Sequence, residues 1–327
     1  MKIALLLRGF AATAVVALLA SGCGGSRATG TVPGIIPQAE MVQTGRGWIK
    51  PGTSAGALLY AAAVNGGSFA TLIYSYPAGQ LVGSLESFGG LCSDTQGNVF
   101  VVSGNAATEY AHGGTTPIQT LRIPGAELYD CAIDPTTNDL AITFSCPPCG
   151  YQDLAIFPNE SGPAVRYHTG NDAWTCAYDG SGNLFINDSL GTALRELPQG
   201  SGYFTTVTFD KSIGPTNQIQ WDGSHMTLQQ LNSPGSIYRF EVVGSTGKIL
   251  TATKFSKKGY ENGLSWIYDG TVVFAFNPKH NTERPTKIGI WNYPHGERPI
   301  RIIGTAPDGG FGAVTVSAPP SRHQEEQ

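Results

Sequence analysis

An aspartate-centred segment returns at a nearly regular interval along this chain. The segment "CAYDGSGNLFI" around Asp179 is matched by "LCSDTQGNVFV" around Asp94, and shorter copies place Asp134, Asp222 and Asp269 in the same position. Successive aspartates are 40, 45, 43 and 47 residues apart. A period in the forties, with two strands around a tight turn in each copy, is typical of a propeller blade. The repeat therefore predicts an all-β fold.

The residues of the turn have a local physical role. The aspartate side chain caps the turn, while Gly97 or Gly182 and the asparagine after each supply the positive φ that such hairpins need. We interpret the repeated aspartates as structural rather than catalytic.

A second segment repeats at the same frequency and completes each blade. Its six copies are "YSYPAG", "EYAHG", "AIFPN", "RELPQG", "YRFEVVG" and "WNYPHG", and a further short strand follows each copy. The pattern predicts a six-bladed β-propeller over residues 48–318, with four-stranded antiparallel blades. The first blade lacks its own aspartate strand, so we expect the C-terminal segment "GFGAVTVS", with Val314 to Val316 at its centre, to pair there. This strand would close the ring and remove a sheet edge.

Composition agrees with this fold and excludes some partners. The chain has 43 Gly and 21 Pro, only 13% charged residues, and no helical periodicity between residues 48 and 320. Loss of Lys2 and Arg8 with a cleaved leader changes the formal charge from −4 to −6, and there is no basic block. Nucleic acid and anionic lipid are therefore not expected partners. Separately, we expect a monomer.

The N-terminus indicates export. Residues 1–22 have two early basic residues, a short apolar run and small residues at the end, as a secretory signal peptide does. "ASGC" resembles a lipobox and predicts acylation of Cys23, with Ala20 where that motif prefers Leu; simple cleavage near the same point is the alternative. Residues 23–47 form an expected flexible tether, and residues 319–327 a disordered tail. The expected location is the bacterial cell envelope, periplasmic or surface-exposed, with the lipid bilayer contacted through Cys23.

Together, these motifs resemble known propeller families. The pattern G-x-x-x-D-x-x-G-N-L-F-[VI] resembles the repeats of NHL and SMP-30-like six-bladed propellers. The combination of "YSYPAGQLVGSL", "EYAHGGTTPIQTL", "CAIDPTTNDLAI" and "CAYDGSGNLFIND" resembles a family of bacterial propeller lipoproteins. The resemblance covers nearly all of residues 48–304 and implies the fold, but it implies no particular activity.

Two motifs resemble catalytic or metal-binding motifs, but each has a simpler structural interpretation. "GTSAG" at residues 52–56 matches a nucleophile elbow, yet Pro51 precedes it and a strand follows, so we expect Ser54 to be a turn residue. Cys146 and Cys149 form a C-x-x-C pair that could close a loop as a disulfide, act as a redox pair or supply half of a zinc site. No helix N-terminus and no second ligand pair supports the last two.

Three further cysteines lie on expected inner strands. Cys131 and Cys176 are three residues before their aspartates, whereas Cys92 is two residues before its own. Strand alternation then turns Cys92 to the opposite face, where it could bond Cys131 across one blade interface. The alternative is that all three are small apolar residues packed between blades.

The loops that enter the inner strands share one face of a propeller and form the expected binding site. Aromatic, carboxylate and amide side chains gather there, and the alternative is that the aromatic ones only fill gaps between blades. The candidate residues are Tyr129, Asp130, Asp172, Trp174, Gln218, Gln220, Glu261, Asn262 and Trp266. The hairpin "NPKHNTERP" places Lys279, His280 and Arg284 on the same face as an expected lid.

Two functions fit this site. The first is a membrane-anchored extracytoplasmic propeller that binds a small polar ligand or an envelope protein, with no catalysis and no cofactor. The second, implied by the SMP-30 resemblance, is a metal-dependent lactonase or hydrolase with Ca²⁺ or Zn²⁺ in the central channel. Asp130, Asp172, Glu261 and Asn262 have suitable chemistry for a hard cation. Their surroundings do not reproduce the metal motifs of that family, so no catalytic residue is assigned.

The lipobox leads to a direct prediction. Cys23→Ala should abolish incorporation of labelled fatty acid, because the acyl chains are carried by that sulfur and the amino terminus next to it. Metabolic labelling and membrane fractionation measure this. A variant that still carries label and stays with membranes would contradict lipidation.

Overall fold

The computed structural model describes residues 47–65, 67–147, 150–169, 173–188, 194–230, 235–255, 260–261, 263–278, 285–304, 306 and 309–320. The strands all belong to one compact unit, residues 38–327. Within the described ranges the chain has no α-helix, only two short 3₁₀ turns, η1 (Thr53–Ala55) and η2 (Pro158–Glu160). No helical segment of this described part is long and apolar enough to span a bilayer. The expected leader, Cys23 and the tether to residue 46 lie outside it.

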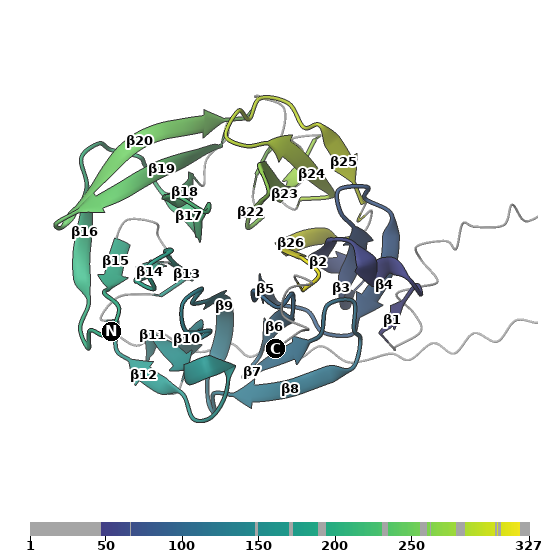
Figure 1. Cartoon of the computed structure of the whole chain (residues 1–327), viewed down its shortest axis with the longest axis horizontal. Helices are drawn as coiled ribbons and strands as arrows, with labels where there is room; N and C mark the ends of the chain where they lie inside the picture. The colour runs from purple at the N-terminus through teal and green to yellow at the C-terminus, as the bar shows by residue number, and fades with distance from the viewer. Residues whose placement is uncertain are drawn as a thin grey trace, which may run out of the picture. The chain divides into compact units, whose positions relative to one another are not determined.

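The described strands form five hydrogen-bonded sheets, and dividing the eight-stranded sheet at its parallel β16–β20 pair gives six antiparallel groups (Figure 1). From the innermost strand outward, the first three groups are β26 (Gly310–Ser317), β2 (Leu58–Asn65), β3 (Ser68–Ser75) and β4 (Leu81–Leu85), with β1 (Trp48–Ile49) at the edge; β5 (Gly90–Ser93), β6 (Val99–Ser103), β7 (Ala106–Tyr110) and β8 (Pro117–Arg122); and β9 (Glu127–Ile133), β10 (Leu140–Cys146), β11 (Tyr151–Phe157) and β12 (Val165–Tyr167).

The other three groups repeat this order. They are β13 (Thr175–Tyr178), β14 (Leu184–Asn187), β15 (Leu194–Leu197) and β16 (Thr205–Phe209); β17 (Thr216–Trp221), β18 (Met226–Gln230), β19 (Ser236–Val243) and β20 (Thr246–Lys254); and β22 (Trp266–Tyr268) with β21 (Tyr260–Glu261), β23 (Thr271–Asn277), β24 (Lys287–Asn292) and β25 (Arg301–Ile303). The groups lie around a common centre, which makes the fold an all-β propeller, as the repeat predicts.

The C-terminal strand closes the ring. β26 pairs antiparallel with β2, and Leu59 lies opposite Val316 while Ala61 lies opposite Val314. In Figure 1 the yellow β26 lies beside the purple β2, although they come from the two ends of the propeller sequence. The closure by residues 310–317 is therefore confirmed. It gives the first group the inner strand that its own sequence lacks.

Burial follows distance from the centre. The second strands β6 and β14 are buried on both faces except for the last residue of β6, because each group packs against a neighbour on either side. The outer strands β8 and β20 are mostly exposed. Six clusters of buried side chains lie between neighbouring groups, and one of them joins β2, β3 and β26 to β23 and β24. Each hydrophobic face is thus covered by the next group around the ring.

The aspartate turns have the predicted glycine geometry, with one correction. Gly97 and Gly182 have φ of 85° and 81°. The expectation of positive φ at the following asparagines, Asn98 and Asn183, is wrong, since neither has it. Their amide groups instead donate to the aspartate: Asn183 Nδ2 lies 2.9 Å from Asp179 Oδ2, and its backbone N–H lies 2.9 Å from Oδ1. One carboxylate therefore holds both the backbone and the side chain of its asparagine.

Two groups are joined at their outer edges. β16 pairs in parallel with β20, with Thr208 opposite Thr246 and Phe209 opposite Gly247, so the fourth and fifth groups form one eight-stranded sheet. The Cβ that any other residue would place at Gly247 lies 2.6 Å from the Phe209 ring, so this approach needs glycine. The sequence repeat did not predict this pairing.

The closure generates a stability prediction. Truncation after Gly304 removes β26, exposes the edge of β2 and uncovers the cluster shared with β23 and β24, so the domain should unfold at a lower temperature or aggregate. Truncation after Pro320 removes no strand and is the control. Equal thermal unfolding of the two truncated proteins would contradict the role of the closing strand.

Candidate functional site

Five inner strands line a cavity of about 210 Å³. It lies beside the aspartate turns that follow these strands, and the exposed Thr95 borders it. Its lining comes from β5, β9, β13, β17 and β22 and the residues after them: Ser93, Asp94, Thr95, Cys131, Ala132, Ile133, Pro135, Cys176, Ala177, Tyr178, Gln218, Ile219, Gln220, Trp221 and Trp266. A cavity at the centre of a ring of inner strands is the usual place for a propeller or barrel ligand site.

The cavity lies at the opposite end of the inner strands from the predicted face. Of the predicted residues, Gln218, Gln220 and Trp266 line it, whereas Tyr129, Asp130 and Trp174 do not. Asp172, Asn262, the side chain of Glu261 and the predicted lid residues Lys279, His280 and Arg284 lie outside the described part of the chain.

Sequence reasoning missed Tyr178 and Trp221, which also line the cavity. Each comes directly before a repeat aspartate, and so do the lining residues Ser93 and Ile133. The residue directly before each repeat aspartate is therefore the sequence position that would have predicted Tyr178 and Trp221.

At the predicted face, polar side chains connect neighbouring groups. In three groups, a polar side chain near the end of the second strand donates a hydrogen bond to a backbone carbonyl oxygen. That oxygen lies at or near the start of the inner strand of the next group. Thr143 Oγ1 lies 2.8 Å from the carbonyl oxygen of Trp174, Asn187 Nδ2 lies 3.2 Å from that of Asn217, and Gln229 Nε2 lies 3.3 Å from that of Gly263. These contacts hold the ring together.

The side chain of Trp174 also makes contacts between neighbouring groups of strands. Its ring centroid lies 5.0 Å from that of Tyr129, and its Nε1 donates to Asn217 Oδ1 at 3.3 Å. The indole therefore packs against one neighbouring group and bonds to the other, as the gap-filling alternative describes.

Asp130 is a buried carboxyl group, only 2% exposed. Its Oδ2 accepts from the backbone N–H of Cys176 at 3.1 Å, and it also accepts from the N–H of Cys131 and the side chain of Gln218. Burial raises the pKa of Asp130 to about 7, and these hydrogen bonds oppose the rise. Asp130 thus links three neighbouring groups through β9, β13 and β17.

Gln218 lies between Asp130 and the cavity. Its side chain bonds to Asp130, and its Nε2 also lies 3.2 Å from the carbonyl oxygen of Ile219. The residue is 6% exposed, and its Oε1 has no hydrogen-bond partner among the described residues. Gln220 differs, because both ends of its amide bind the backbone of Ile267, at 3.2 and 2.8 Å. Gln218 therefore holds a buried acceptor that makes no hydrogen bond within the described part of the chain.

The cysteines are distributed as follows. Cys92 and Cys131 form a disulfide between β5 and β9, which joins two neighbouring groups. Cys146 takes part in a disulfide, and its predicted partner Cys149 lies outside the described residues. Cys176 is a free, buried cysteine at the cavity wall, and burial raises the pKa of its thiol well above the ordinary value. A buried protonated thiol of this kind is a packing residue.

Three carboxylates meet between the second and third groups. Oxygens of Asp94, Glu109 and Glu160 lie within 4.8 Å of one another. Gln119 Nε2 donates to Glu109 Oε2 at 2.7 Å, whereas Glu160 Oε1 is buried without a partner in the described part. Burial, and then the charges of Asp94 and Glu109, raise the pKa of Glu160 to about 8. Within the described residues, this cluster is the set of side chains that could hold a divalent cation.

At two other junctions between neighbouring groups, the equivalent contact joins neutral side chains. The turn after a third strand reaches the aspartate turn of the preceding group. Gln199 Nε2 lies 2.9 Å from Thr136 Oγ1, and the Tyr76 hydroxyl bonds to Thr271. Glu160 occupies the corresponding turn and meets Asp94 instead. This local concentration of carboxylates borders the cavity, because Asp94 belongs to both.

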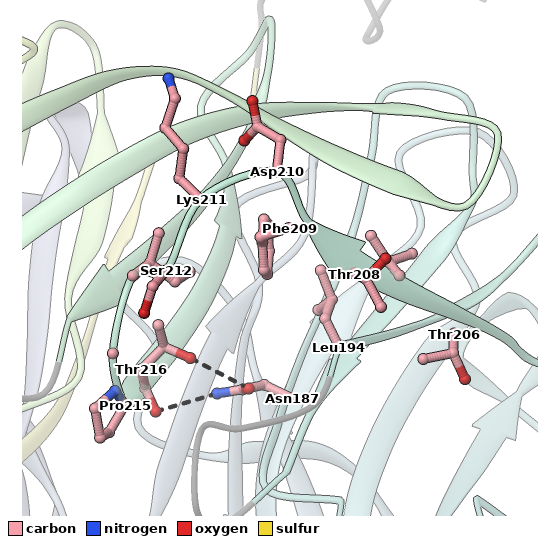
Figure 2. A pocket seen from close by; sticks show the side chains of 13 residues that line it. Asn187, Leu194, Thr206, Thr208, Phe209, Asp210, Lys211, Ser212, Pro215 and Thr216 are labelled. Carbon is pink, nitrogen blue, oxygen red and sulfur yellow. Dashed lines mark hydrogen bonds between the residues drawn. The ribbon is translucent and has the colours of Figure 1, made fainter.

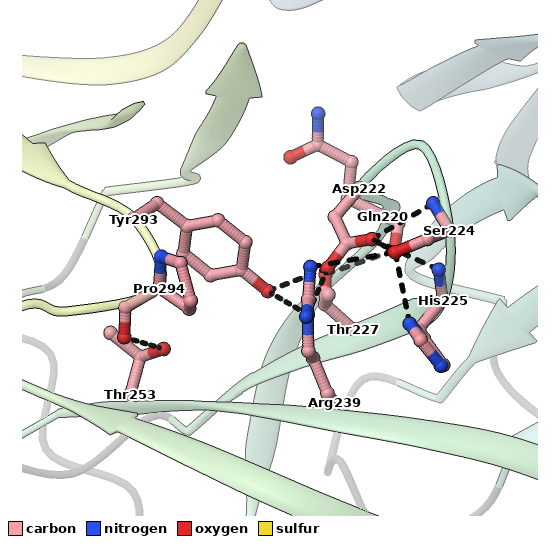
Figure 3. A network of polar contacts seen from close by, with 9 residues as sticks. All are labelled: Gln220, Asp222, Ser224, His225, Thr227, Arg239, Thr253, Tyr293 and Pro294. Carbon is pink, nitrogen blue, oxygen red and sulfur yellow. Dashed lines mark hydrogen bonds and ion pairs between the residues drawn. The ribbon is translucent and has the colours of Figure 1, made fainter. Parts of the chain in front are cut away.

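Asp222 is the centre of a polar network between the fifth and sixth groups of strands (Figure 3). Its Oδ2 lies 2.5 Å from Arg239 Nε and 2.8 Å from the Tyr293 hydroxyl. Burial acts to raise the pKa of Asp222, but hydrogen bonds from Tyr293, the His225 backbone N–H, Arg239 and Ser224 outweigh it and lower the pKa. Ser224 Oγ lies 2.9 Å from His225 Nδ1 and 3.0 Å from Asp222 Oδ1.

This network is not a catalytic triad. In a triad the histidine lies between the serine and the carboxylate, whereas here Ser224 lies between His225 and Asp222 (Figure 3). Asp222 is also held by Arg239. The "GTSAG" segment gives no nucleophile elbow either, since Ser54 lies in the 3₁₀ turn η1 and not between a strand and an α-helix.

A larger hollow of about 620 Å³ lies beside β16 and residues 210–216 (Figure 2). Several of its polar side chains already have partners. Thr216 Oγ1 lies 3.4 Å from Asn187 Oδ1, and Asp210 Oδ1 accepts from the backbone N–H of Ile249 at 3.0 Å. We prefer the smaller central cavity as the candidate site, because five inner strands converge on it and aromatic and polar residues line it together.

Comparisons with known proteins identify the fold class. No protein-family model matches the chain, and no curated protein matches it. A protein of unknown function from Bacteroides caccae is 11% identical, with a TM-score of 0.60, over 80% of this chain and 99% of that chain. A chain of a nidogen/laminin complex is 10% identical, with a TM-score of 0.59, over 81% and 100% of the two chains.

TolB from Acinetobacter baumannii is also similar. It is 14% identical, with a TM-score of 0.57, over 82% of this chain and 68% of that chain. At these identities the similarity supports the β-propeller fold and carries no activity across.

The buried Asp130 leads to a pH prediction. Its pKa is about 7 in the folded chain against 3.8 for an ordinary aspartate, so the folded state holds the proton more tightly. Its contribution to stability is complete below pH about 4 and is lost as the pH rises to about 7, at about 1.4 kcal/mol per pH unit. Asp130→Asn should remove this slope, as measured by urea unfolding at several pH values.

The control for this experiment has the opposite sign. The pKa of Asp222 is lowered, so its contribution is lost on acidification, and Asp222→Asn should flatten the stability curve on the acidic side. Parallel curves for the wild-type protein and Asp130→Asn between pH 4 and 7 would contradict the assignment to Asp130.

Proposed function

We propose that the protein is a six-bladed binding propeller of the bacterial cell envelope, held to a membrane through acylated Cys23, and that it binds a small polar ligand in the central cavity without catalysis. The observation that carries the proposal is the lining of the central cavity, which combines the polar residues Gln218 and Gln220 with the aromatic residues Trp221 and Trp266. A hollow lined by aromatic side chains and a few polar groups is typical of a small-molecule site.

A small ligand fits better than a protein partner. The cavity of about 210 Å³ is a small concave hollow among the inner strands rather than an extended surface. The envelope location rests on the N-terminal sequence, with its basic start, apolar run and "ASGC". The NHL and SMP-30 resemblance likewise rests on the sequence repeats.

The lactonase alternative receives less support from the contacts. Of its four candidate ligands, Asp130 is the one whose side chain is described, and its carboxylate accepts from two backbone N–H groups and from Gln218. These three donors occupy most of the carboxylate's roughly four lone-pair sites, and Asp130 does not line the cavity. Asp172, Asn262 and the side chain of Glu261 lie outside the described part.

Trp266 provides the test of the proposal. Trp266→Ala should weaken the binding of a cavity ligand by about 1–3 kcal/mol, since it removes an aromatic wall of the site. Ligands are first found by thermal shift with sugars, amines, alcohols and short peptides, and their affinities are then measured by calorimetry.

The matched control is Trp291→Ala. Trp291 is 3% exposed and its ring lies 3.9 Å from that of Phe274, away from the cavity lining. This change should cost about 3–5 kcal/mol of stability and leave the affinity unchanged. Equal affinity of wild type and Trp266→Ala for every ligand found would rule out the central cavity as the site.

A further inference from the structure

Apolar side chains are exposed between the outer strands of the first and second groups. Ile118 of β8 is 55% exposed. Its neighbour Gln119 bonds to the backbone of Glu160 in the third group, so strand alternation turns Ile118 the other way, toward the first group. On the side of the first group, Phe69 is 59% exposed, and its ring lies 5.2 Å from that of Phe88. We call Phe69, Phe88 and Ile118 the β4–β8 surface.

The described part of the chain begins beside this surface. β1 pairs antiparallel with the outer edge of β4, and Trp48 lies opposite Ser84 (Figure 1). A Cβ added at Gly47 would lie 3.2 Å from the carbonyl oxygen of Ser84 and 3.2 Å from Cβ of Thr115, which comes shortly before β8. The backbone at residue 47 is therefore held between β4 and the start of β8.

The register of β1 gives the direction of the residues that precede it. Because Trp48 lies opposite Ser84 in an antiparallel pair, each step back along the chain moves one residue forward along β4 and beyond it. Arg46 would then lie opposite Glu86, and the chain before it would run toward Phe88. Glu86 is exposed and forms no ion pair within the described part of the chain. Opposite charges in facing positions stabilise a strand pair.

The preceding segment has a suitable length and composition. The compact unit that contains the strands begins at residue 38. Residues 38–46, "QAEMVQTGR", include the apolar Met41 and Val42 and the charged Glu40 and Arg46. At about 3.3 Å per residue, an extended segment of this length spans about 30 Å, and β8 spans about 20 Å. The segment is thus long enough to follow the whole of β8.

We infer that residues 38–46 dock in extended form along the β4–β8 surface, with Arg46 opposite Glu86 and with Met41 and Val42 covering the exposed apolar side chains. The occupant of this surface is the chain's own N-terminal segment. The inference goes beyond the proposed ligand binding and does not depend on the central cavity. With Cys23 acylated as proposed, the docked segment would hold the first and second groups toward the membrane and leave residues 24–37 as the free part of the tether.

Proteolysis at Glu40 tests the docking. Residues 23–47 contain Glu40 and no other acidic residue, and a docked segment cannot enter the active site of a protease. Residues 23–327 with Cys23→Ala, which carry no lipid, are treated with a glutamate-specific protease, and mass spectrometry follows cleavage after Glu40. Cleavage at Glu325 and Glu326 is the internal standard. Ile118→Asn should accelerate cleavage after Glu40 by about fivefold or more, because it removes apolar surface without adding a charge.

The matched control is Ile302→Asn. Ile302 is 53% exposed and lies on β25, the outer strand of the last group, so this change removes an equally exposed isoleucine elsewhere. It should leave the rate of cleavage after Glu40 unchanged.

A charge exchange tests the register. Glu86→Arg and Arg46→Asp should each accelerate cleavage after Glu40 by about threefold or more, because each places like charges opposite one another. The double variant should return to the wild-type rate. A double variant cleaved as fast as Glu86→Arg would overturn the assigned register.

Two outcomes would overturn the docking itself. The first is an equal rate of cleavage after Glu40 in the wild-type protein and in Ile118→Asn. The second is a concentration-dependent dimer that Ile118→Asn dissociates, which would assign the β4–β8 surface to a second copy of the chain. No ligand enters this experiment, so a failure of ligand binding at the central cavity would not change its result.

Discussion

The antiparallel pairing of β26 with β2 is the interaction on which the rest of the structure depends. It turns a row of sheets into a ring, so the first and last groups can share a hydrophobic cluster. Without a closed ring, two sheet faces would remain exposed to water, and the inner strands would have no common centre. The central cavity is a consequence of closure, because five inner strands from different parts of the chain contribute its wall. Fold stability and site geometry therefore have the same origin.

The fold could be predicted because its signals are local. Asp94 and Asp179 bind groups four residues away, so the turn chemistry is visible in a few consecutive letters. The closing strand was also predictable, since the first group visibly lacked an inner strand. The parallel pairing of β16 with β20 has no such signal. It depends on the distance between two outer strands, β16 and β20. Packing between residues that are distant in sequence sets this distance, and no sequence pattern records it.

The site was only partly predictable for a related reason. Gln218, Gln220 and Trp266 were expected near the channel and line the cavity, but the sequence could not indicate which end of the channel stays hollow. That depends on contacts such as Asp130 with Gln218, which fill part of the interior and join groups that are distant in sequence. Trp174 illustrates the same limit, because its type suits a ligand pocket equally well as the junction where it packs against Tyr129.

The edge pairing of β16 with β20 makes two sequence repeats into one cooperative unit. In repeat architectures each unit is stabilised by its own fold and by its neighbours. Here the fourth and fifth units share backbone hydrogen bonds as well as side-chain packing, so opening one requires opening the other. Backbone amides at this part of the rim should resist solvent exchange, whereas amides on an unpaired outer edge are open to water. The rim is thus also protected at this place from the addition of a foreign strand, which is the common hazard of an open sheet edge.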